Sequence, residues 1–143
     1  MKITQISVFL ENKKGRLYDA IRLLGEKGID IKTLSIAENE DFGILRMIVD
    51  RPEQSLEVLK AHDFVASMTD IVAVEVDDHP GGLACVLKVL EENKINIEYM
   101  YAFVEKRVDR AILVFRFDDL DKAIEILTKN GIRVVGKKDI VNL

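Results

Sequence analysis

The stretch LENKKGRLYDAIRLLGEKGIDI, residues 10–31, aligns without a gap with VDDHPGGLACVLKVLEENKINI, residues 76–97. Gly15 matches Gly81 at an offset of 66 residues, because 81 − 15 = 66. Beyond the next turn the offset becomes 68, and Asp50 matches Asp118. Two blocks of matches that are separated by one change in loop length indicate an internal repeat. The second copy therefore carries two extra residues, which we place around residues 105–109.

Each copy shows the same succession of apolar spacings. A run of strand-like alternation comes first, a loop with glycine follows, and then apolar residues recur at helical spacing. Two further strands, a second helix and a short closing strand complete each copy. These later strands are expected at residues 31–37, 44–49 and 64–68, and at 97–103, 112–117 and 132–135. The residues expected to point into the core are Ile6, Val8, Leu10, Leu45, Met47 and Val49, and then Val72, Val74, Val76, Leu113, Phe115 and Phe117.

The resulting order is βαββαβ, twice. It predicts an α+β protein of two tandem ferredoxin-like domains with antiparallel sheets, residues 1–68 and 69–143. Gly28 suits the end of the first helix, where a left-handed residue is wanted, and Pro52 suits the first turn of the next helix. Because no linker rich in Ser, Gly or Pro separates the copies, we expect a rigid pair that packs together.

Composition narrows the class of protein. The chain has 143 residues, 48% of them hydrophobic, and a formal net charge of −4, which argues against a nucleic-acid partner. One cysteine, Cys85, excludes an internal disulfide. No run approaches the ~18 consecutive apolar residues of a membrane span, and no signal peptide is recognisable. We expect a cytoplasmic protein that needs no cofactor or metal and contacts neither membrane nor nucleic acid.

The loop DDHPGGL, residues 77–83, is followed by a helix and then by INI, residues 95–97. This succession resembles the ACT-domain pattern, and the resemblance covers essentially the whole chain, once per copy. It implies a module that regulates amino-acid enzymes, such as aspartate kinases or phosphoglycerate dehydrogenases. In that family an amino acid sits between two paired domains, held by the first loop and by a polar side chain at the start of the second strand. The first copy departs from the pattern, because Lys14 replaces the proline and Asp30 replaces the asparagine.

Elementary chemistry supports a zwitterion site at these positions. A helix N-terminus offers free N–H groups and partial positive charge to a carboxylate, and glycine permits close approach of the backbone. An ammonium group needs an acceptor, which Asn96 or Asp30 can supply. The second loop keeps the whole pattern and is the better candidate. The candidate ligand-binding residues are Asn12, Gly15, Arg16, Leu17, Asp30 and Ile31, and then Asp78, His79, Pro80, Gly81, Gly82, Leu83, Asn96 and Ile97.

Several of these residues also have a purely structural interpretation, and Asn96 is one of them, because it could merely satisfy a loop. Gly15 and Gly81 serve equally well to make tight turns. Pro80 is expected to lock its loop, and Asp78 to cap the following helix. His79 is expected to be solvated, because no other histidine is placed near it. Cys85 lacks the neighbouring histidine of a catalytic thiol.

The function that fits best is an amino-acid sensor that acts through a partner, such as an enzyme or regulator of amino-acid metabolism. The alternatives are a structural interaction module without a ligand and an RNA-binding module on the same fold. An enzyme is not expected, because no metal cluster, phosphate loop or nucleophile–base pair is recognisable. Apolar residues on the outward sheet faces predict a homodimer. These residues are Ile44, Ile48, Ile112 and Val114, together with Tyr99, Tyr101 and Phe103.

Overall fold

The computed structural model describes residues 1–38, 41–103 and 110–142, and the chain divides into two compact units. The N-terminal unit is Thr4–Thr69, and the C-terminal unit is Asp70–Leu143 together with Met1–Ile3. The two extra residues of the second copy were predicted in a segment that lies outside the described residues. The expected rigid packing of the two copies stays a prediction.

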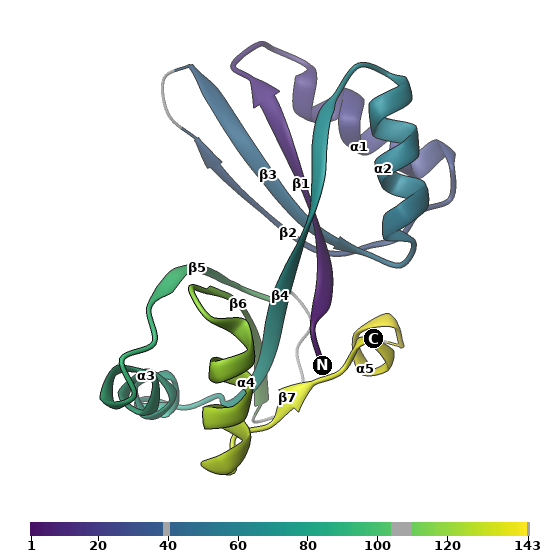
Figure 1. Cartoon of the computed structure of the whole chain (residues 1–143). Coiled ribbons are helices and arrows are strands. Elements are labelled where there is room, and N and C mark those ends of the chain that lie inside the picture. Colours follow the sequence, from purple (N-terminus) through teal and green to yellow (C-terminus); the bar gives the residue numbers. More distant parts are fainter. Residues whose placement is uncertain (39–40, 104–109, 143) are drawn as a thin grey trace. The chain divides into compact units, whose positions relative to one another are not determined.

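The N-terminal unit places two helices against one side of an antiparallel sheet (Figure 1). Its strands are ordered β2-β3-β1-β4, and β1 and β2 both pair antiparallel with β3. Its elements are β1 (Ile3–Glu11), α1 (Arg16–Glu26), β2 (Ile31–Glu38), β3 (Phe42–Val49), α2 (Pro52–Ala61) and the first part of β4 (Val65–Asp77).

The C-terminal unit repeats this plan. Its strands are ordered β7-β4-β6-β5, and every pairing is antiparallel. Its elements are the rest of β4, α3 (Gly82–Glu92), β5 (Ile97–Ala102), β6 (Arg110–Phe117), α4 (Leu120–Lys129), β7 (Val134–Val135) and α5 (Lys137–Val141). The predicted α+β class with two ferredoxin-like βαββαβ copies is confirmed.

Alternation along the strands decides which side chains are buried. All twelve residues predicted to point into the core are at most 8% exposed, and they form one apolar cluster in each unit. In the C-terminal cluster the rings of Phe115 and Phe117 stack with centroids 5.2 Å apart. Gly28 adopts a left-handed φ of 69° just after α1, and α2 begins at Pro52, as predicted.

Two elements differ from the sequence prediction. The closing strand of the first copy and the opening strand of the second form one strand, β4, because residues 69–71 include no glycine or proline to interrupt an extended backbone. The short helix α5 was not predicted. Its start is stabilised because the backbone N–H of Gly136 donates to Asp139 Oδ2 at 3.3 Å, and Ile140 is buried.

The prediction of an exposed apolar sheet face was wrong for four residues. Ile48, Ile112, Val114 and Phe103 are between 0% and 8% exposed within the chain, while Ile44, Tyr99 and Tyr101 are half-buried. Alternation marks a second apolar face but does not reveal whether the fold covers that face. Among the described residues, no helix is long and apolar enough to cross a membrane.

Candidate functional site

The loop between β1 and α1 turns on a left-handed glycine. Gly15 has φ of 87°, a conformation that residues with a Cβ rarely adopt. Its carbonyl oxygen accepts the N–H of Asp19 at 2.9 Å and so begins α1. The turn alone therefore accounts for a glycine at this position.

The loop between β4 and α3 has the same geometry. Gly81 has φ of 88°, and its carbonyl oxygen accepts the N–H of Cys85 at 3.1 Å. The cap of α3 is Gly81 itself and no side chain bonds there, so the predicted capping role of Asp78 was wrong. The chain reaches its left-handed turn three residues later than Asp78, and the helix begins only after it.

Gly82 is a glycine for a different reason. A Cβ at this position would lie 2.0 Å from the carbonyl oxygen of Asp77, far inside van der Waals contact. The first residue of α3 is thus pressed against the end of β4, and its N–H donates to His79 O at 3.0 Å. The motif predicted a ligand contact for this glycine, but the close approach to the Asp77 backbone is sufficient to require it.

The second loop carries a weakly paired histidine. His79 is exposed, as predicted; its Nδ1–H donates to Pro80 O at 2.9 Å, and its Nε2 lies 3.6 Å from Asp77 Oδ2. The Pro80 carbonyl first, and the Asp77 carboxylate second, raise the pKa of His79 above its ordinary 6.5. Within the described residues no cluster of three or more His, Cys, Asp or Glu side chains could hold a metal.

The first loop carries more charge than the second. Lys13 Nζ lies 2.9 Å from Glu11 Oε2, and this bond lowers the pKa of Glu11. The guanidinium of Arg16 lies over the Phe64 ring, 4.1 Å from its centroid. Arg16 Nε is buried and has no hydrogen-bond partner in the described part of the protein. A buried N–H donor without an acceptor is costly, so an acceptor supplied by a ligand would be favourable there.

A hollow of about 150 Å³ lies at this first loop. Three predicted residues line it: Asn12, Arg16 and Leu17. Six others were not predicted as site residues: Leu10, Glu11, Lys13, Ile36, Phe42 and Gly43. The antiparallel register brings Phe42 and Gly43 there, because Glu11 lies opposite Phe42 and Leu10 opposite Gly43. The facing ends of the first and third strands were the signal that could have found them.

The other predicted half of the site lies at the starts of β2 and β5. The N–H of Asp30 donates to Asp50 Oδ1 at 3.0 Å, and that of Asn96 donates to Asp118 Oδ1 at 3.1 Å. The Asp30 carboxylate pairs with Lys32 Nζ at 2.8 Å. The side-chain amide of Asn96 is exposed and has no partner among the described residues. Ile31 and Ile97 are half-buried beside them.

Neither unit brings its own loop and its own second-strand start together. They lie at opposite ends of an 11-residue helix, α1 or α3, and at ~1.5 Å per residue such a helix is roughly 16 Å long. In the C-terminal unit, Asp78, His79, Pro80 and Gly81 are exposed at the loop, Gly82 is buried and Leu83 is half-buried. One ligand that used both halves would have to join a loop to a strand start from a different copy of the repeat.

Comparison with known proteins finds a matching family and several structures of the same architecture. Residues 1–143 match the family model of the ACT domain pair. A crystal structure of a Bacteroides thetaiotaomicron protein is 39% identical, with a TM-score of 0.94 and coverage of 100% of this chain and 98% of that one. The ligand-free regulatory subunit of aspartate kinase from Thermus thermophilus is 17% identical, with a TM-score of 0.65 and coverage of 88% and 91%.

The Clostridium acetobutylicum aspartate kinase is 13% identical with a TM-score of 0.54, and the match covers 90% of this chain but 33% of that enzyme. No curated protein matches the chain significantly. The two aspartate-kinase structures share its fold. The family model spans every residue, and the same βαββαβ unit occurs twice with a glycine turn before each first helix. The chain therefore belongs to the ACT domain pair family.

Proposed function

We propose that this chain is a regulatory module that binds a free amino acid and transmits its presence to a partner protein of amino-acid metabolism in the cytoplasm. Membership of the ACT domain pair family supports the regulatory role. The ligand is proposed to lie between two ACT-like copies, with its carboxylate at a glycine loop and its ammonium group at Asn96 or Asp30. A ligand can contact a loop of one copy and a strand start of another copy, whereas the loop and the strand start of one unit lie at opposite ends of a helix.

One observation carries the proposal furthest. The hollow at the first loop is lined by Arg16, whose buried Nε is an unused donor. A ligand carboxylate is the acceptor that such a guanidinium takes most strongly, because charge-assisted hydrogen bonds are shorter and stronger than neutral ones. The sequence pattern favours the second loop, and the hollow favours the first, so each loop needs its own variant.

Isothermal titration calorimetry with each common amino acid tests the proposal. We expect at least one to bind with submillimolar affinity. Arg16→Gln tests the first loop, and Asn96→Ala tests the ammonium acceptor that the second copy would present to that loop. Asp30→Ala tests the acceptor that the first copy would present to the second loop. Loss of one charge-assisted hydrogen bond, of order 1.5–3 kcal/mol, weakens binding about tenfold or more. Arg22→Gln is the control, because Arg22 lies on the same helix but pairs with Glu26 at 2.8 Å, away from the hollow.

Two results would contradict the sensor interpretation. One is the absence of submillimolar binding by any amino acid. The other is binding that none of Arg16→Gln, Asn96→Ala and Asp30→Ala weakens. Gly81→Val is unsuitable as a test, because φ of 88° at this position strains any side chain and confuses loss of binding with loss of folding.

The homodimer also remains a proposal. Four of the seven predicted apolar residues are buried, but the exposed apolar residues of the N-terminal unit include Phe9 and Val65, at 41% and 70% exposure. These side chains border a hollow of about 190 Å³ together with the half-buried Ile44. Exposed apolar patches of this kind mark interfaces.

A further inference from the structure

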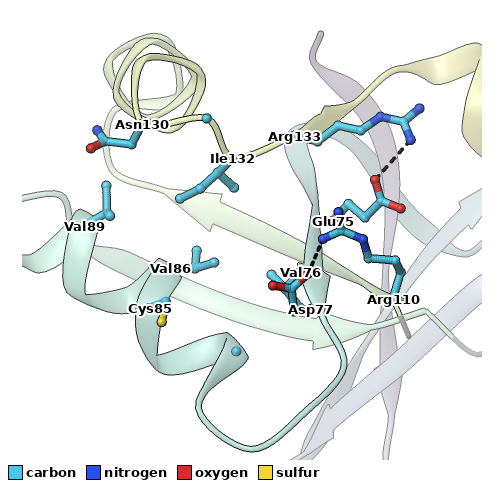
Figure 2. Close-up of a pocket in the computed structure, with 12 residues that line it drawn as sticks. Glu75, Val76, Asp77, Cys85, Val86, Val89, Arg110, Asn130, Ile132 and Arg133 are labelled. Atoms are coloured by element: carbon cyan, nitrogen blue, oxygen red, sulfur yellow. Dashed lines mark hydrogen bonds and ion pairs between the residues drawn. The ribbon is translucent and has the colours of Figure 1, made fainter. Parts of the chain in front are cut away.

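A third cavity, of about 270 Å³, lies wholly within the C-terminal unit (Figure 2). The end of β4, residues 82–89 of α3 and the turn between α4 and β7 line it on three sides. Its volume is close to the lower end of the ~300–1,000 Å³ of ordinary ligand pockets, which suits a metabolite of amino-acid size.

The internal repeat explains why this cavity is open. Gly82 corresponds to Arg16 (82 − 66 = 16) and Ile132 corresponds to Phe64 (132 − 68 = 64). In the N-terminal unit the Arg16 guanidinium lies over the Phe64 ring and occupies the equivalent place. In the C-terminal unit Gly82 has no side chain and cannot acquire one without meeting Asp77 O. The second copy therefore keeps a space that the first copy fills with a cation and an aromatic ring.

The cavity has an apolar side and a charged side. Figure 2 shows Val86 and Val89 from α3 grouped with Ile132 from the turn before β7. Apolar surface of this kind is suited to an aliphatic side chain, because the hydrophobic effect is non-directional and scales with the apolar area removed from water.

The charged side consists of two ion pairs. Arg110 pairs with Asp77, and Arg133 Nη1 lies 3.0 Å from Glu75 Oε2, whose side chain is only 8% exposed. Arg133 has a second acidic partner, Asp139. Arg110 bonds to Asp77, and because a guanidinium has five N–H donors, Arg110 keeps donors for a ligand. Two cations and two anions side by side can satisfy both charges of a zwitterion.

We propose that this cavity binds an α-amino acid with an aliphatic side chain. The ligand carboxylate bonds to Arg110, the ammonium group bonds to the Asp77 or Glu75 carboxylate, and the side chain packs on Val86, Val89 and Ile132. This inference rests on the proposed function for the class of ligand, but the site is complete within one unit and uses neither Asn96 nor the first loop.

Cys85 provides a direct readout, because it is the chain's one cysteine, it is exposed, and it lines the cavity. The rate of its alkylation by N-ethylmaleimide is measured with increasing leucine, isoleucine or valine, and with aspartate and lysine for comparison. At about ten times Kd the site is about 90% occupied, so we expect an aliphatic amino acid to slow alkylation by up to about tenfold. Aspartate and lysine should leave the rate unchanged.

Two variants test the chemistry. Arg110→Gln removes the carboxylate partner and should raise the half-protecting concentration at least about tenfold. Ile132→Phe introduces the ring of the N-terminal copy, narrows the cavity and should abolish protection, so the proposal remains testable if Arg110→Gln folds poorly. Circular dichroism and the melting temperature verify the fold of each variant.

Asn96→Ala and Asp30→Ala separate this site from those between copies, because each removes one proposed ammonium acceptor. Protection of Cys85 that Arg110→Gln abolishes and both of these variants preserve belongs to the cavity. Protection that only Asn96→Ala or Asp30→Ala abolishes overturns the cavity proposal and supports a site between copies. Calorimetric binding of an aliphatic amino acid without any change in the Cys85 rate also overturns the cavity proposal, and it leaves the proposed function standing. Equal protection by aspartate overturns the ligand class.

Discussion

Replacing Gly82 by alanine adds a single methyl group at a backbone position that has no room for it. The new Cβ would lie 2.0 Å from Asp77 O, and ordinary contact begins at 3.4 Å, so the start of α3 must move by about 1.4 Å (3.4 − 2.0) away from β4. That movement weakens the bonds from Gly82 N–H to His79 O and from Cys85 N–H to Gly81 O, now 3.0 and 3.1 Å.

The expected cost follows from these contacts. Overpacking costs about 1–3 kcal/mol and each backbone hydrogen bond about 1 kcal/mol, while the lower entropy of unfolded alanine returns about 0.4–1 kcal/mol. We expect a net loss of about 2–4 kcal/mol in the free energy of unfolding, a large share of the ~5–15 kcal/mol that holds a typical domain folded. The loss should be confined to the C-terminal unit.

Urea unfolding followed by circular dichroism measures the loss, and amide hydrogen exchange assigns it to one unit. Gly25→Ala is the matched control, because Gly25 lies within α1 and an added Cβ meets no atom within 4 Å. Alanine there should stabilise the protein by about 0.5–1 kcal/mol. A Gly82→Ala variant as stable as the parent, or equal losses of stability in both variants, would refute this prediction.

Three further predictions concern other contacts. A double-mutant cycle with Arg16→Met and Phe64→Leu should give a coupling of about 0.5–2 kcal/mol in the free energy of unfolding, as expected for a cation over a ring; additive effects would exclude that contact. Proton NMR should give His79 a pKa above 6.5 that Asp77→Asn lowers only in part, because the Pro80 carbonyl is the larger cause. Since folding raises this pKa, the stabilisation from His79 is complete below about pH 6.5 and disappears as pH rises through the folded value, and a pKa at or below 6.5 would contradict the observed geometry. Sedimentation at micromolar concentration should give a dimer that Phe9→Ser weakens, and a monomeric parent protein would contradict the homodimer.

The repeat, the order of elements and the core could be predicted from sequence because these features are local. Alternation along Ile6, Val8 and Leu10 determines which face of a strand is apolar, and helical spacing does the same for a helix. The glycine turns were also predictable, since a left-handed φ at Gly15 and Gly81 favours glycine whatever lies nearby. Periodicity could not indicate whether the opposite face of the sheet was covered, so Ile48 and Val114 were wrongly expected to be exposed.

Sequence alone thus determined two ferredoxin-like copies and the loops at which a ligand is sought. The tertiary structure decided what those loops contact. It placed Asp30 and Asn96 a full helix away from their own loops, and it brought Phe64 beneath Arg16, 48 positions along the chain (64 − 16). It also opened the cavity beside Gly82. Such contacts depend on strand register and on the direction of each helix, because these fix the distance between residues far apart in sequence, whereas the periodicity of one segment fixes only the face on which each side chain lies.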